Sequence, residues 1–205
     1  MPDDQFESEL HARGLKWVAG VDEAGRGPLA GPVAAAAVIL PRGFTCSGLD
    51  DSKKLSAKRR ESLHESITTH PEVIWAVAMV SAEEIDRLNI LRATHLAMRQ
   101  AVEQLSQRPD HCLIDGLPVK GFPISHDGIV KGDGKSLSIA AASIVAKVTR
   151  DRKMREMDLE FPEFGFARHQ GYGTKEHLEA LRIHGPCRHH RRSFQPVAQL
   201  TLPLD

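Results

Sequence analysis

The amino-acid sequence predicts an α/β fold, in which a mixed β-sheet is covered by helices and followed by a helical C-terminal part. Short, apolar, β-prone runs come first, strand-like and helix-like segments alternate after them, and the last clear segment is helical. The chain has 205 residues, of which 41% are hydrophobic and 26% are charged, as in an ordinary globular protein. Such a chain can bury one sizeable core, so a single domain is expected.

The strands are predicted at residues 16–21, 32–40, 72–80 and 111–116. Each is a short apolar run bounded by turn residues. The first runs out at Asp22 and Glu23, just before a Gly-Arg-Gly turn, and the fourth ends in Asp115 and Gly116. Neighbouring side chains on a strand point to opposite faces, so Asp22 and Glu23 can share a site only if the strand bends or ends there.

The helices are predicted at residues 81 to about 107, 136 to about 160 and 174–184. The first begins with the capping box Ser81-Ala82-Glu83-Glu84, and the last stops at Gly185-Pro186. The helix from 136 has an apolar side and a second side that carries Ser143, Lys147 and Arg150.

Charge and cysteine content exclude several classes of protein. The 27 basic and 27 acidic residues balance, so an anionic partner must be held by a local patch. Cys46, Cys112 and Cys187 form no CxxC motif, which favours a reducing compartment over a disulfide framework. The first ten residues lack the features of a signal peptide, and no apolar run reaches membrane-spanning length. We therefore expect a cytoplasmic protein.

Acidic residues occur at three places with the same local pattern: Asp22 with Glu23, Asp115, and Asp133 within a Gly-Asp-Gly turn. If these carboxylates converge in a cleft of low dielectric constant, they repel one another, and a bound divalent cation is the simplest relief. Oxygen ligands favour Mg²⁺ or Mn²⁺ over Zn²⁺, and a pair of such ions is a common solution for hydrolysing phosphodiesters. The alternative is that Asp115 caps a turn and Asp133 caps a helix.

Several ordered motifs resemble those of the ribonuclease HII family. They are DEAGRGPLAGPV at 22–33, DSKKLS at 51–56, LIDG at 113–116, GDGKS and AASIVAKVTRD within 132–151, and HQGYGT at 169–174. The resemblance covers roughly residues 17–197, which leaves 1–16 as an N-terminal extension and 198–205 as a tail. It implies an RNase H-like fold and a metal-dependent endonuclease that cuts the RNA strand of RNA/DNA hybrids. It also implies cutting on the 5′ side of ribonucleotides embedded in duplex DNA, as in ribonucleotide excision repair, leaving 5′-phosphate and 3′-hydroxyl ends.

The resemblance also assigns roles to individual residues. It implies a catalytic set that binds two Mg²⁺ or Mn²⁺ ions, consisting of Asp22, Glu23, Asp115 and Asp133. It implies that the nucleotide with the 2′-hydroxyl is contacted by Gly25, Arg26 and Gly27, largely through backbone groups. It further implies that Tyr172, the only tyrosine in the chain, packs on the neighbouring sugar.

Basic residues suggest where phosphates could bind. Lys53 and Lys54 follow a glycine-containing loop, while Lys147 and Arg150 share a helix face near Asp133, so phosphate contacts are plausible at both places. A second basic run, at residues 188–192, could also bind phosphates. The same region carries a weak zinc-ligand pattern with irregular spacing, made of His184, Cys187, His189 and His190.

Other functions also have to be considered. The sequence Gly134-Lys135-Ser136 resembles the end of a phosphate-binding loop, but Ile129 stands where that motif requires glycine. A non-catalytic nucleic-acid binding module would use the basic residues but not the acidic set, and a DNA nuclease of the resolvase or transposase type would cut all-DNA substrates. Residues 199–205 resemble a peptide that docks on the sliding clamp, although they lack its terminal phenylalanine, and a plain tail is the alternative.

Overall fold

The computed structural model describes residues 2–49, 52 and 55–200. Lys53 and Lys54, two of the predicted phosphate-binding residues, lie outside the described residues, as do residues 201–205 of the predicted clamp-binding peptide.

A mixed sheet of five strands forms the centre of the molecule, in the order β3-β2-β1-β4-β5. The strands are β1 (Val18–Ala24), β2 (Val33–Ile39), β3 (Ile74–Val80), β4 (His111–Asp115) and β5 (His126–Ile129). β2 is antiparallel to both β1 and β3, whereas β1, β4 and β5 run parallel to one another. The predicted α/β class, a mixed sheet flanked by helices, is confirmed.

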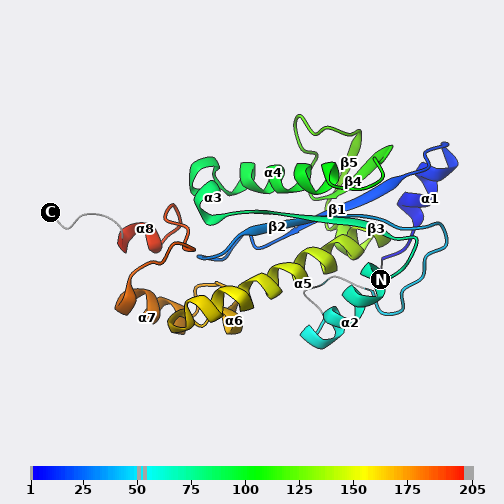
Figure 1. The fold of residues 1–205 in the computed structure, drawn as a ribbon. Coiled ribbons are helices and arrows are strands. Elements are labelled where there is room, and N and C mark those ends of the chain that lie inside the picture. The colour runs from blue at the N-terminus through cyan, green and yellow to red at the C-terminus, as the bar shows by residue number, and fades with distance from the viewer. Residues whose placement is uncertain (1, 50–51, 53–54, 201–205) are drawn as a thin grey trace.

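Helices cover both faces of this sheet, as Figure 1 shows. The helices before the long fifth one are α1 (Gln5–Ala12), α2 (Ala57–Thr68), α3 (Ala82–Leu88) and α4 (Ile90–Glu103). After them come η2 (Gly132–Gly134), α5 (Leu137–Glu160), η3 (Pro162–Phe164), α6 (Phe166–His169), α7 (Lys175–His184) and α8 (Val197–Leu200). Helices α3 and α4 lie on one face, and α5 and α2 lie on the other (Figure 1). Helix α6 lies beside the far end of α5, and α7 and α8 lie beyond it, so these three helices form the predicted helical C-terminal part (Figure 1).

The alternation of small apolar residues along β2 builds a core on each face. Ala35 and Ala37 belong to the cluster under α4, and Ala36 and Val38 belong to the cluster under α5. On the α5 side the approach is very close, because a Cβ added at Gly20 would lie 2.1 Å from the main-chain carbon of Ser138. This contact fixes the start of α5 across the middle of β1.

Two expectations about secondary structure need correction. The helix predicted from 81 to about 107 is broken at Asn89, which has a φ of 71° and whose side chain caps α4 by accepting the Arg92 N–H. The first strand does not end before Asp22 but continues to Ala24, since its pairing with β2 extends that far. Strand β5 and helix α1 were not predicted. No helix in the described ranges is both long enough and apolar enough to span a membrane.

Candidate active site

Two of the predicted acidic residues lie side by side at the same edge of the sheet. Strands β1 and β4 are parallel, and their last registered pair is Val21 with Ile114. The next residues along the two strands are Asp22 and Asp115. The carboxyl ends of parallel strands meet at one edge, so the topology brings together residues that are far apart in the sequence.

Asp22 is buried close to two other acidic residues, Glu23 and Asp115. Its side chain is only 4% exposed. Burial raises the pKa of Asp22 well above its usual value, and the negative charges of Glu23 and Asp115 raise it further. A hydrogen bond from Ser143 of α5 opposes these effects, as does the Glu23 N–H, which donates to Asp22 Oδ1 at 2.7 Å. Ser143, which the sequence placed only on a polar helix face, therefore supports a site residue.

Of the other two acidic residues, Glu23 follows Asp22 on β1 and Asp133 comes from a separate segment. Asp133 belongs to η2 and is 6% exposed. The residue before it, Gly132, donates its N–H to Asp115 Oδ1 at 2.6 Å, which ties this loop to the end of β4. Glu23 Oε1 pairs with Arg26 Nη1 at 3.3 Å.

The carboxylate oxygens of these four acidic residues are suitable ligands for a hard divalent cation. In this structure Asp22, Glu23 and Asp115 accept hydrogen bonds from protein groups. Across the described part of the chain, no three His, Cys, Asp or Glu side chains are already grouped to hold a metal ion. Asp22, Asp115 and Glu23 instead accept from the Glu23 N–H, the Gly132 N–H and the Arg26 guanidinium. A cation would compete with these donors and would also relieve the repulsion that raises the pKa of Asp22.

The loop after β1 is held from beneath by the buried side chain of Arg191. Its guanidinium donates to the carbonyl oxygens of Gly25 at 2.5 Å, Arg26 at 2.8 Å and Gly31 at 2.9 Å. Burial, and then the charge of Arg150, lower the pKa of Arg191 to about 9. The prediction that the run 188–192 binds phosphates is wrong for Arg191. Its guanidinium is buried, and its Nε, Nη1 and Nη2 atoms all donate to backbone carbonyls.

Arg150 has a similar structural role. It is 1% exposed and donates to the carbonyls of Pro32, Ala30 and Gln170. The prediction of a phosphate contact on a solvated face of α5 is therefore wrong for Arg150. Gly25 has a φ of 95°, and a Cβ there would lie 2.0 Å from Arg150 Nε, so both its conformation and its surroundings require glycine.

Tyr172 lies next to the Gly-Arg-Gly loop. A Cβ added at Gly27 would be 3.5 Å from Cε1 of Tyr172, so the ring borders the open backbone of this glycine. The side chain of Tyr172 is 47% exposed, and that of Arg26 is 51% exposed. The fold thus brings the predicted substrate loop and the predicted tyrosine together.

Lys147, another predicted substrate-binding residue, lies on α5, and its Nζ pairs with Asp151 Oδ1 at 2.8 Å.

A chain of buried histidines supports the backbone of Tyr172. His190 Nδ1 accepts the Cys187 N–H at 3.0 Å, so in its neutral form its Nε2 carries the proton and donates to His177 Nε2 at 3.0 Å. His177 Nδ1–H then donates to the Tyr172 carbonyl at 2.9 Å. Each ring is held in one neutral tautomer, and adding a proton to either would place two N–H groups face to face.

Because His177 and His190 are held neutral, we expect the folded protein to lose stability in weak acid. Burial lowers the pKa of His177 to about 4 and that of His190 to about 3, below the ordinary 6.5. Between pH 6.5 and the lowered pKa values, the unfolded chain binds protons that the folded chain does not. The histidines therefore do not reduce the free energy of unfolding above pH 6.5, and this free energy falls as the pH drops towards 4. Each histidine contributes about 1.4 kcal/mol per pH unit. Urea unfolding of the native chain and of His190→Gln, from pH 7.5 to 4.5, should show a smaller pH slope for the variant; equal slopes would contradict this account.

Solved structures with this fold come from the ribonuclease H class of nucleases. Ribonuclease H2 of Pyrococcus horikoshii OT3 superposes with a TM-score of 0.76 at 26% identity, covering 90% of this chain and 97% of that chain. The PCNA:RNase HII complex of Archaeoglobus fulgidus gives 0.69 at 27% identity, covering 88% and 96%. A ribonuclease HIII in complex with Mn²⁺ gives 0.75 at 18% identity, covering 93% and 70%. The chain therefore has the RNase H fold.

Sequence comparison defines the family. The sequence model of ribonuclease HII matches residues 19–197. Ribonuclease HII of Geobacillus kaustophilus (strain HTA426) is 53% identical over 196 residues, 96% of this chain and 75% of that protein. Ribonuclease HII of Myxococcus xanthus (strain DK1622) is 56% identical over 201 residues, 97% of this chain and 68% of that protein. The chain belongs to the ribonuclease HII family, and it is an endoribonuclease that cleaves the RNA strand of RNA/DNA hybrids.

Proposed function

We propose that this endoribonuclease depends on a divalent cation, Mg²⁺ or Mn²⁺, and that it also cuts on the 5′ side of single ribonucleotides embedded in duplex DNA. The observation that carries the proposal is the position of Asp22 beside Asp115, next to a glycine loop bordered by Tyr172. The carboxylates of Asp22 and Asp115 thus lie next to the exposed backbone of the glycine loop. A nuclease that recognises the sugar of a single nucleotide needs both features close together.

The cation would be held by oxygen atoms of Asp22, Glu23, Asp115 and Asp133. When bound, it would supply an activated water and neutralise charge at the phosphorus. Ser143 keeps Asp22 oriented by its hydrogen bond, while the Gly132 N–H orients Asp115. Glu23 would exchange its pairing with Arg26 for the cation, which frees the exposed guanidinium to meet a substrate phosphate.

The backbone of the loop would read the sugar. The missing Cβ of Gly25 leaves room for Arg150 beneath the loop, and Gly27 carries no Cβ on the side of Tyr172, so the main chain here can approach a 2′-hydroxyl closely. Arg150 and Arg191 hold this loop in a fixed shape from beneath. The exposed ring of Tyr172 would pack on the sugar that follows the ribonucleotide.

The test uses three duplexes of one sequence: one with a single ribonucleotide, one with a continuous RNA strand, and one of DNA alone. We expect cleavage of the first two with Mg²⁺ or Mn²⁺, no cleavage with chelator, and 3′-hydroxyl ends immediately 5′ of the ribonucleotide. Cutting of the all-DNA duplex would instead favour a DNA nuclease of the resolvase or transposase type.

Tyr172→Ala should reduce cleavage at a single ribonucleotide by about 10- to 100-fold, because packing of an aromatic ring on a nucleotide is worth about 1–3 kcal/mol. Tyr172→Phe keeps the ring and should stay close to the native rate. The continuous RNA strand should be affected less, since other contacts position it. Equal losses for alanine and phenylalanine would show that the hydroxyl, and not the ring, carries the effect.

As a second proposal, residues 199–205 contact the sliding clamp. The first two residues of this peptide, Gln199 and Leu200, lie at the end of α8. The RNase HII of Archaeoglobus fulgidus has been solved in complex with PCNA, which also supports the proposal. A chain ending at residue 198 should lose binding to the sliding clamp and keep the native rate on a short duplex. Unchanged clamp binding would dismiss this proposal.

A further inference from the structure

The N-terminal arm, defined as residues 2–12, is joined to the start of α5 through its main chain. The Asp3 N–H donates to the Lys135 carbonyl at 3.1 Å, and the Leu137 N–H donates to the Asp3 carbonyl at 2.9 Å. These two bonds form a parallel bridge between Asp3 and Ser136. The first residues of the chain therefore lie along the segment that leads from Asp133 into α5.

One side chain of the arm, Glu7, makes a stronger connection. Its Oε1 accepts from the Ser136 hydroxyl at 2.6 Å, the Ser138 hydroxyl at 2.5 Å and the Ser138 N–H at 2.9 Å. Glu7 is 7% exposed, and both serines are fully buried. A carboxylate at the N-terminus of a long helix is also favoured by the helix dipole.

The same segment is tied to the acidic edge of the sheet. The N–H groups of Lys135 and Ser136 donate to the Gly132 carbonyl at 2.9 and 2.8 Å. Gly132 in turn donates its N–H to Asp115. Each hydrogen bond from Glu7 to the start of α5 is thus connected, through one short turn, to both Asp115 and Asp133.

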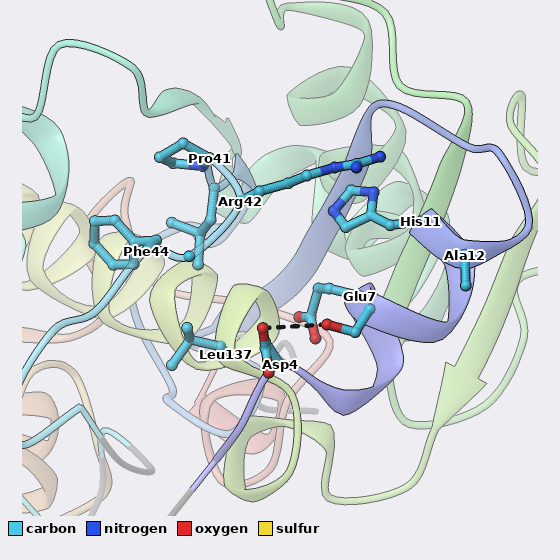
Figure 2. A pocket seen from close by; sticks show the side chains of 11 residues that line it. Asp4, Glu7, His11, Ala12, Pro41, Arg42, Phe44 and Leu137 are labelled. Atoms are coloured by element: carbon cyan, nitrogen blue, oxygen red, sulfur yellow. Dashed lines mark hydrogen bonds between the residues drawn. The ribbon is translucent and has the colours of Figure 1, made fainter.

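Packing alone does not fix this side of the arm. A cavity of about 340 Å³ lies between α1, the segment 40–44 after β2, and Leu137 (Figure 2). Figure 2 shows Glu7 and Asp4 at its edge, near Leu137 at the start of α5. Away from this cavity, Leu10 of α1 belongs to an apolar cluster with Val18, Ile129 and Ile139. The polar contacts of Glu7 therefore join the arm to the segment after Asp133 at the side where the cavity leaves α1 without close packing.

Only one of the two oxygens of the Glu7 carboxylate has hydrogen-bond partners among the described residues. Its second oxygen, Oε2, is buried and has no hydrogen-bond partner in the described structure. A buried charge with half of its acceptors unused is a poor device for stability alone. It is an effective device for fixing one geometry, since two buried serines and one buried N–H depend on it.

We infer that Glu7 is a positioning residue for the loop that carries Asp133, and that the N-terminal arm completes the cation site without contacting it. The inference rests on the proposed function in that Asp133 is taken as a cation ligand. Removal of groups that orient metal ligands typically weakens metal affinity by about 10- to 100-fold.

The experiment compares the full-length chain with Glu7→Ala, Glu7→Gln and the control Glu9→Ala. Glu9 lies on the same helix and is exposed, and its side chain accepts from Gln5 Nε2 at 2.9 Å. Two quantities are measured: hydrogen exchange of the amides of residues 132–138 without metal, and Mn²⁺ affinity by calorimetry. We expect Glu7→Ala to exchange about 10- to 100-fold faster in this segment and to bind Mn²⁺ about tenfold more weakly.

Glu7→Gln keeps an acceptor oxygen, so its hydrogen exchange at 132–138 and its Mn²⁺ affinity should lie between those of Glu7→Ala and the native chain. If the alanine variant does not fold, the glutamine variant alone tests whether Glu7 positions the loop. Unchanged exchange at 132–138, or an equal increase in the strands β2 and β3, would overturn the inference. A native chain that binds no Mn²⁺ would refute the proposed function instead, and the exchange data would still decide whether Glu7 holds the loop.

Discussion

Replacement of Asp115 by asparagine should reduce cleavage of a single-ribonucleotide duplex by about 10²- to 10³-fold, with substrate binding retained. Asparagine has the same shape and keeps an oxygen that can accept the Gly132 N–H, so the loop beside it should stay in place. What is lost is one negative charge beside Asp22, and with it part of the site for a cation that stabilises the transition state by several kcal/mol. Single-turnover rates and a filter-binding titration in Ca²⁺ measure the two effects separately.

Asp127→Asn is the matched control for this prediction. Asp127 lies on the neighbouring strand β5, is exposed, and pairs with His111 at 3.0 Å, away from the acidic edge. Its replacement should leave the rate within about threefold of the native chain, because its carboxylate is hydrogen-bonded to His111 and takes no part in the acidic edge. Equal rates for Asp115→Asn and the native chain would mean that the acidic edge is not the catalytic centre.

Replacement of Arg191 by alanine should destabilise the fold by about 3–5 kcal/mol. Its buried guanidinium donates to the carbonyls of Gly25, Arg26 and Gly31, which would lose this donor, and the carbonyl of Gly31 lies in a buried position. Arg191→Lys keeps a charge but not the planar fork, so it should recover only part of the stability. Urea unfolding measures the loss, and cleavage below the unfolding transition measures the effect on the loop.

Arg188→Ala provides the comparison within the same basic run. Its side chain is 66% exposed and pairs with Glu160 at the surface, so we expect a change of less than about 1 kcal/mol. If Arg191→Ala were as stable as Arg188→Ala, the loop would not depend on the buried arginine.

The predicted sheet and long helices follow from local pattern. The runs that became β2 and β3 are apolar throughout, and the caps Ser81, Ser136 and Thr174 all accept a backbone N–H at a helix start. Strand β5 was missed because its sequence, His-Asp-Gly-Ile, has no apolar run and forms only by pairing with β4. The break at Asn89 was missed because its left-handed conformation interrupts an otherwise continuous helical pattern.

The acidic edge was predictable because strand ends can be recognised in the sequence, and parallel strands bring their ends together. The roles of Arg150 and Arg191 were not predictable in this way. A charged side chain on a helix or in a basic run is usually solvated, and only the folded chain shows that carbonyls from residues 25–32 surround both. Glu7 was missed for the same reason, since its partners lie about 130 positions away.

Calorimetric titration of Mn²⁺ into the native chain, Asp22→Asn and Asp115→Asn tests most directly whether the acidic edge binds a cation. We predict binding by the native chain and an affinity at least about tenfold weaker in each variant, because each removes one carboxylate from the edge. Undiminished affinity in both variants, or no binding by the native chain at millimolar Mn²⁺, would contradict the account.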